Sequence, residues 1–93
     1  MFDKMKQLME FKKQAEIIRD ELGRATLEID TGKGIRIIVN GTQDLRRIEI
    51  DPDRLLPDGK AALEEDLLEA VNQAVKKSQE TAAQRMASFI PSE

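Results

Sequence analysis

The spacing of the apolar residues changes twice along this chain, and that change constrains the fold most. Between Leu8 and Leu22, apolar side chains recur every three or four residues, which is the period of an amphipathic helix. From Ala25 to Ile50 the period is two, as in half-buried strands, and after Lys60 the helical spacing returns. The sequence therefore predicts the order helix, strands, helix, which is an α+β fold.

The first predicted helix has a seam of apolar residues separated alternately by three and four positions. This pattern is that of a short coiled coil and predicts that one face of the helix is buried. Asp3 is placed to cap the helix start, and Gly23 stands where a residue just after a helix commonly lies. Met9 and Ile17 widen the stripe, so we expect this face to pack against more than one neighbour. The seam residues are Leu8, Phe11, Ala15, Ile18 and Leu22.

Three antiparallel strands in a meander are predicted between the helices. A turn with two glycines joins the first two strands, and a second loop leads into the third. In the third strand, Arg46 is expected to share a face with Ile48, and Leu45 with Arg47. At most one of the two arginines can then belong to a given surface patch, and a cross-strand pair with an acid is expected for the other.

The last predicted helix runs from about Lys60 to Ala87, after two turns with helix-starting signals. Asp51-Pro52-Asp53 stops the third strand, Pro57-Asp58-Gly59 repeats the signal, and Pro91 marks the end of the helix. Its apolar face is formed by Leu63, Leu67, Val71, Ala74, Ser78 and Ala82, and is broadened by Leu68 and Val75.

The predicted sheet is too small for the elements around it. Three strands leave two open edges, and two long helices with wide apolar faces exceed what such a sheet can cover. A homodimer would resolve both problems, by pairing sheet edges or by packing helix seams together.

The composition fits one small soluble domain, residues 1–93, with 40% hydrophobic and 35% charged residues. No apolar run approaches the roughly 20 residues needed to cross a bilayer. Lysines interrupt the N-terminal stretch where a signal peptide needs continuous apolar residues, so we expect a cytoplasmic protein. The net charge of −3 means that any nucleic-acid binding must depend on local charge.

Catalysis has little support in the sequence. The chain has no histidine and no cysteine, so nucleophilic triads and thiolate metal sites lose their usual members. No phosphate-binding glycine loop or dinucleotide fingerprint is present. Asp51 and Asp53 could be read as a cation site or an acid/base pair, but turn capping explains both. We therefore predict no enzymatic activity, no cofactor and no metal.

The stretch VNGTQDLRRIEIDPDRLL resembles the central signature of the YbaB/EbfC nucleoid-associated proteins. The similarity extends to the leading MFDKMKQL, to LEEDLLEAVNQAVKKSQE and to MASF, and so covers nearly the whole chain. Many members also carry a glycine- and methionine-rich segment before the first helix or after the last, so this chain is expected to be a trimmed version. The matching signature residues are Asn40, Gly41, Arg47, Ile48, Glu49, Ile50, Asp51 and Pro52.

The resemblance implies a tweezer-like homodimer with projecting helices that binds double-stranded DNA with little sequence preference. Such a protein would organise the nucleoid, with gene regulation as a further role. The signature itself also has a structural explanation, in which Asn40-Gly41 tolerates positive φ and Asp51-Pro52 caps a turn.

Basic residues on the two helices are the candidates for phosphate contact. Lys6 and Lys13 are seven residues apart and share a helix face, although i,i+4 pairs with Glu10 and Glu16 are an alternative role for this set. The last helix is acidic in its first half and basic in its second, which the helix dipole alone would also favour. The candidate DNA-binding residues are Lys4, Lys6, Lys12, Lys13, Arg19, Lys76, Lys77 and Arg85.

The overall acidity favours a competing hypothesis from another functional class. The protein could be an interaction adaptor that docks a DNA repair or recombination protein and has no direct affinity for DNA. Steep loss of DNA binding with added salt would distinguish a phosphate clamp from such an adaptor.

Overall fold

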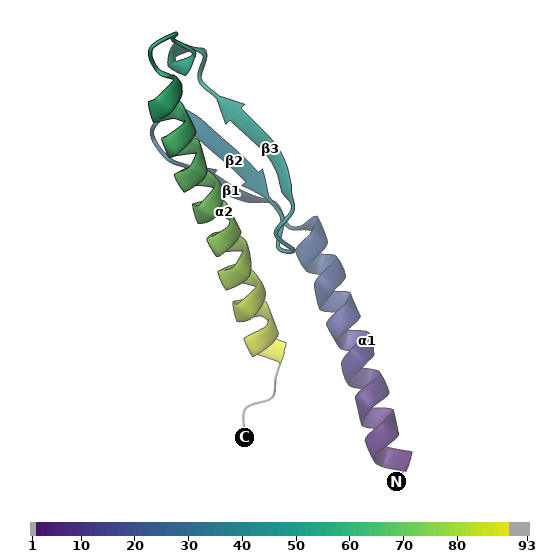
Figure 1. Cartoon of the computed structure of the whole chain (residues 1–93). Helices are drawn as coiled ribbons and strands as arrows, with labels where there is room; N and C mark the ends of the chain where they lie inside the picture. Colours follow the sequence, from purple (N-terminus) through teal and green to yellow (C-terminus); the bar gives the residue numbers. More distant parts are fainter. Residues whose placement is uncertain (1, 90–93) are drawn as a thin grey trace.

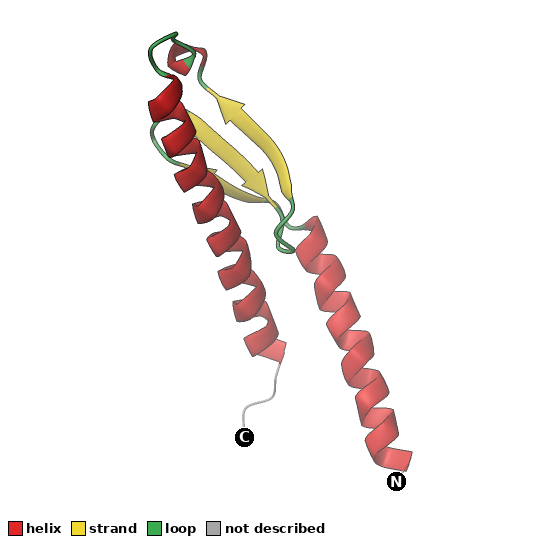
Figure 2. Cartoon of the chain, in the orientation of Figure 1, coloured by secondary structure: helices red, strands yellow, loops and turns green. Residues whose placement is uncertain are grey.

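The computed structural model describes residues 2–89, and its elements follow the predicted order (Figures 1 and 2). The predicted α+β fold of helix, three-stranded antiparallel meander and helix is confirmed, with sheet order β1-β2-β3. Pro91, predicted to end the last helix, lies outside the described residues. The elements are α1 (Phe2–Arg24), β1 (Leu27–Asp30), β2 (Ile35–Val39), β3 (Leu45–Ile50), a 3-10 turn (Pro52–Arg54) and α2 (Lys60–Phe89).

The core lies between the central strand β2 and the helix α2. Ile35, Ile37 and Val39 alternate along β2 with more exposed residues and point toward α2, where Ala70 and Ala74 are fully buried. The small alanines let the helix approach the sheet closely, and each buried isoleucine contributes roughly 1.5–3 kcal/mol. The apolar face predicted for this helix is therefore the face that packs on the sheet, except that Leu68, which was predicted to broaden it, is 64% exposed.

The third strand contains a bulge that the alternating pattern did not reveal. Ile38 pairs with Arg47 while the next residue, Val39, pairs with Leu45, so Arg46 is the extra residue. Because a bulge shifts the alternation by one position, Leu45 lies on the same sheet face as Val39. The prediction that Leu45 shares a face with Arg47 was therefore wrong.

The C-terminal end of α1 is held by the loop between β2 and β3. The buried Asn40 side chain donates from Nδ2 to the Gly23 carbonyl at 3.1 Å, and the Gly41 amide donates to the Leu22 carbonyl at 2.7 Å. These bonds satisfy helix carbonyls that have no partner within the helix. The helix continues to Arg24, so Gly23 is inside its last turn and not beyond its end.

Gly41 is needed for close approach, and the predicted positive φ is absent there. Among the described residues, positive φ angles occur at Gly32, Gly34 and Gln43. A Cβ atom on Gly41 would lie 2.8 Å from the Cβ, Cδ2 and carbonyl oxygen of Leu22. The asparagine-glycine pair thus holds the loop so close to the end of α1 that no side chain fits at position 41.

Only the last part of the predicted α1 seam is buried in the single chain. Ile18 and Leu22 are buried, whereas Leu8, Phe11 and Ile17 are more than half exposed. The reason is that α2 ends beside the middle of α1, and the first turns of α1 extend past it (Figure 1). Within one chain no neighbour reaches the first half of the stripe, so the prediction that this face packs against more than one neighbour would require a second copy there.

Candidate nucleic-acid interface

The projecting half of α1 carries four lysines with no acidic partner. Lys4, Lys6, Lys12 and Lys13 are all exposed, and none of them forms an ion pair within the described part of the chain. The alternative ion pairs, Lys6 with Glu10 and Lys12 with Glu16, are not formed in the described part of the chain. These ammonium groups are therefore available to an external anion.

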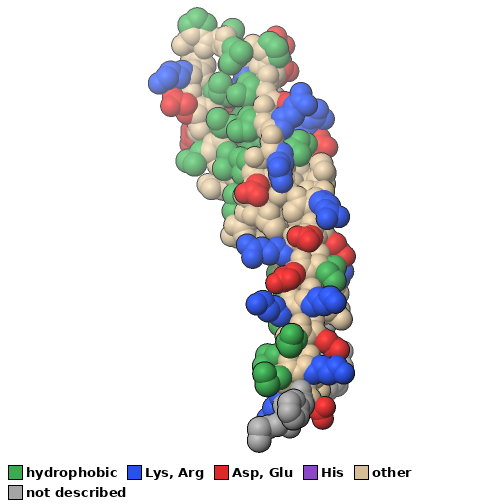
Figure 3. Space-filling view, turned by 90° about the vertical axis from the view of Figure 1, so that its right-hand side faces the viewer, with side chains coloured by type: hydrophobic (Ala, Val, Ile, Leu, Met, Phe, Trp, Pro, Cys, Tyr) green, Lys and Arg blue, Asp and Glu red, His purple; other side chains and the backbone are tan. Residues whose placement is uncertain are grey.

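Three of these lysines surround one shallow hollow on the side of α1. The helix alone forms it, since every lining residue comes from this element and successive lining residues lie on neighbouring turns. Figure 3 shows the same end of the molecule with blue side chains on both sides of green ones. The hollow is lined by Lys6, Met9, Glu10, Lys12, Lys13 and Glu16.

Two of the other predicted contact residues already have partners inside the chain. Arg85 binds Glu21 of α1, with its Nε 3.0 Å and its Nη2 2.9 Å from the same carboxylate oxygen. Lys77 donates from Nζ to the backbone carbonyl of Glu28 on β1 at 2.9 Å. Arg85 thereby links the two helices, and Lys77 links α2 to the sheet.

The remaining candidates are exposed and lie apart from the α1 lysines. Lys76 lines a shallow hollow on α2 with Leu68 and neighbouring polar residues. Arg19 lies near the end of α1, beside Thr42 and Asp44 of the loop that holds this helix. The structure thus brings Lys6, Lys12 and Lys13 together around one hollow, whereas Lys76 and Arg19 each line a different one.

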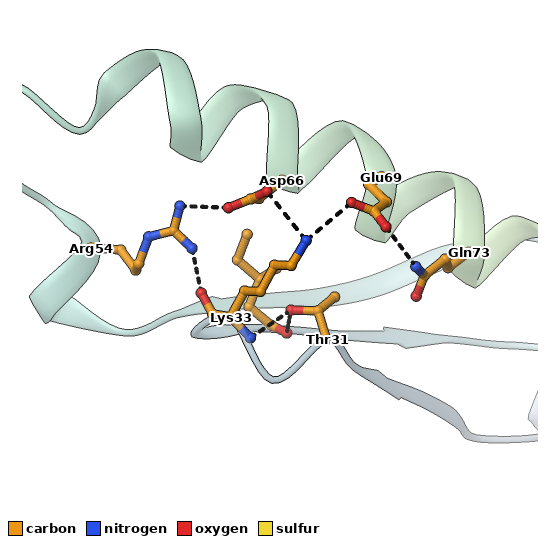
Figure 4. Close-up of polar contacts among 7 residues, drawn as sticks. Thr31, Lys33, Arg54, Asp66, Glu69 and Gln73 are labelled. Carbon is orange, nitrogen blue, oxygen red and sulfur yellow. Dashed lines mark hydrogen bonds and ion pairs between the residues drawn. The ribbon is translucent and has the colours of Figure 1, made fainter.

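The acidic half of α2 is partly neutralised by residues that the sequence analysis did not single out. Figure 4 shows Lys33 of the β1–β2 turn between Asp66 and Glu69, at 3.7 and 3.4 Å. Arg54 binds Asp66 at 2.8 Å and also donates to the Lys33 carbonyl. The members of this cluster are far apart along the chain, so no local pattern links them. The one feature of the sequence that pointed to the cluster was a lysine inside a glycine-containing turn.

The sheet face opposite α2 has its own charge network. Arg36 bridges Glu28 and Glu49 on the two flanking strands, with its Nε 2.8 Å from Glu49. The hydrogen bond and charge of Glu49, and then those of Glu28, raise the pKa of Arg36 above its ordinary value. Arg47 also pairs with Glu49, but along its own strand. The cross-strand pair with an acid that was expected for Arg46 or Arg47 is formed by Arg36 instead, so that prediction was wrong. Arg46 donates to the Gly23 carbonyl at 3.4 Å.

The aspartates after β3 act in a turn. Asp51 accepts a hydrogen bond from the Asp53 amide at 2.9 Å, which caps the 3-10 turn as the sequence predicted. Across residues 2–89 no group of three or more acidic, histidine or cysteine side chains is arranged to hold a metal ion. No helix in that range is long and apolar enough to span a membrane.

Comparison with known proteins gives a consistent result. A model of the YbaB/EbfC DNA-binding family matches residues 1–93. A nucleoid-associated protein of Pelotomaculum thermopropionicum is 35% identical over 83 residues, which covers 88% of this chain and 79% of that protein. One from Moorella thermoacetica is 37% identical over 84 residues, covering 89% and 81%. The crystal structure of an uncharacterized Helicobacter pylori protein shares the fold at 20% identity, with a TM-score of 0.73 over 90% of this chain and 99% of that one.

Proposed function

Because this chain belongs to the YbaB/EbfC DNA-binding family, we propose that it is a nucleoid-associated protein that binds double-stranded DNA as a homodimer. Its contacts are mainly with phosphates, through the basic residues of the two helices. It acts in the cytoplasm on the nucleoid, where it organises DNA and influences transcription.

The observation that carries this proposal is the set of unpaired lysines on the projecting half of α1. Lysine is a flexible point charge that suits phosphates at varied positions. The acids at the start of α2 lie at the other end of the molecule, where Lys33 and Arg54 bind them. The negative net charge is therefore compatible with a locally basic surface at the free end of α1.

The uncovered apolar face of β3 supports a second copy as the dimer partner. The helix α2 packs across β1 and β2, and it leaves Leu45 and Ile48 of β3 36% and 45% exposed. Figure 3, viewed from the β3 side, shows apolar side chains gathered over this end of the molecule. At the opposite edge, one β1 carbonyl, that of Glu28, already accepts a hydrogen bond from Lys77. Pairing two β3 faces covers this apolar surface and places both copies of α1 on one particle.

Neutralising two lysines tests the phosphate clamp. We expect Lys12→Gln with Lys13→Gln to weaken binding to a duplex of about 30 base pairs by at least tenfold at low salt. The slope of log affinity against log salt should fall by up to about 3.6, because a dimer loses four lysines that contribute about 0.9 each. Fluorescence anisotropy at several salt concentrations measures both quantities.

Lys60→Gln is the matched control. This lysine starts α2 at the opposite end of the molecule and pairs with Glu64 at 3.3 Å, so its loss should leave the salt slope unchanged. Equal effects of the two changes would contradict a clamp on α1. If the wild-type dimer does not bind DNA even at low salt, direct DNA binding is wrong and the adaptor hypothesis takes its place.

A further inference from the structure

The free end of α1 exposes large apolar side chains that the phosphate clamp does not use. Met5, Leu8 and Met9 are 66%, 68% and 71% exposed, and we call these three residues the tip patch. They lie in the turns of α1 that extend past the end of α2 (Figure 1). Exposed apolar side chains that gather at one place on a soluble protein commonly mark an interaction site.

Lysines surround the tip patch on the helix surface. The nearest neighbours of a helical residue are those three and four positions away. For Met9 these are Met5, Lys6, Lys12 and Lys13, and for Leu8 they include Lys4 and Lys12. None of these neighbours of Met9 or Leu8 is acidic. Glu10 and Glu16 line the hollow that contains Met9, but the four lysines outnumber them. An apolar centre with a border of net positive charge therefore faces outward at the end of the helix.

This border decides what kind of partner can cover the patch. If the tip patch packed on the same patch of a second copy, the lysines of both helices would meet, and like charges at such distances repel. A partner must instead offer anionic groups at its rim and an apolar surface between them. The grooves of a DNA duplex have this arrangement, with phosphates along the rims and stacked bases between.

We propose that the tip patch is a wedge that enters the minor groove of DNA and partly unstacks a base step. This inference rests on the proposed function, since the lysines must first bring α1 to the phosphates. Methionine and leucine are among the apolar residues that proteins insert between base pairs, which kinks DNA by roughly 20–90°. Met5 and Met9 are one helical turn apart, so both reach the same groove from one helix. The protein thus bends the DNA that it binds.

The experiment separates bending from binding. A duplex of about 20 base pairs carries a donor dye at one end and an acceptor at the other, so that a kink raises energy transfer. Wild-type protein should bind and raise the transfer. The variant Met5→Gln with Met9→Gln should bind within about tenfold of the wild type at low salt, because its lysines remain, but should lose the rise. Leu68→Gln, which removes an equally exposed apolar side chain from α2, should bind and bend like the wild type.

Each of the other results would overturn the wedge, and one of them would also overturn the proposed function. Wild-type protein that saturates the duplex without a change in energy transfer, or a Met5→Gln, Met9→Gln variant that bends DNA fully, overturns the wedge and leaves DNA binding intact. Wild-type protein that does not bind at low salt overturns the proposed function, and the wedge with it. If the double variant bends DNA normally but sediments as a smaller species than the wild type, the tip patch contacts a second copy and the wedge is wrong.

Discussion

Replacing Ile48 by aspartate is expected to convert the protein from a dimer to a monomer. In the proposed dimer, this side chain on β3 is covered by the second copy, although it is 45% exposed in one chain. Burying an unpaired carboxylate costs several kcal/mol, and a symmetric interface contains two of them, so the dissociation constant should rise by at least about 100-fold. Sedimentation equilibrium at several protein concentrations measures this change.

The same variant should also lose most of its DNA affinity, because two linked copies of α1 bind a duplex more tightly than one. Leu68→Asp is the control, since Leu68 is more exposed than Ile48 and lies in a hollow that α2 residues alone line. Circular dichroism checks that both variants are folded. A folded Ile48→Asp protein that remains a dimer at micromolar concentration would show that β3 is not the interface.

Replacing Gly41 by alanine is expected to loosen the attachment of α1 to the sheet. The added Cβ atom would lie 2.8 Å from three atoms of Leu22, one of them a backbone oxygen that cannot move like a side-chain end. Overpacking of this kind costs about 1–3 kcal/mol, and separation of the segments would also break the bond from the Gly41 amide to the Leu22 carbonyl. Thermal or urea unfolding measures the lowered free energy of unfolding.

Gly23→Ala provides a control at the same helix end. A Cβ atom there meets nothing within 4 Å, and this residue lies inside α1, where alanine is favoured over glycine by roughly 0.8–1 kcal/mol. We therefore expect Gly23→Ala to stabilise the protein slightly while Gly41→Ala destabilises it. If both changes have the same sign, the close contact between the loop and Leu22 does not control stability.

The local pattern of the sequence was sufficient for the elements and for much of the core. The period of two between Ala25 and Ile50 predicted that alternate residues of a strand point to one side, and in β2 the buried residues Ile35, Ile37 and Val39 do so. The helical spacing of α2 likewise predicted the face on which Ala74 is buried. These predictions succeeded because the side-chain direction follows from the period of a single element.

The candidate site was predictable only as a set of charges. The sequence showed lysines on α1, but not which cations were already paired within the chain. Arg85 forms an ion pair with Glu21 between the two helices, and Arg54 forms one with Asp66 across the turn that separates them. Such pairs depend on distances between elements, and the spacing of residues within one element does not reveal those distances. The bulge at Arg46 is another example, since the register of β3 against β2 reveals it.

The sequence by itself determined the order of the elements, the faces on which apolar residues gather and the absence of histidine and cysteine chemistry. Only the tertiary structure decided which apolar faces are covered. Periodicity shows that Leu8 and Leu22 lie on similar sides of one helix, but not that a neighbour reaches only Leu22. Burial requires a second surface at contact distance, and the lengths and directions of α1 and α2 leave the first turns of α1 without one in a single chain.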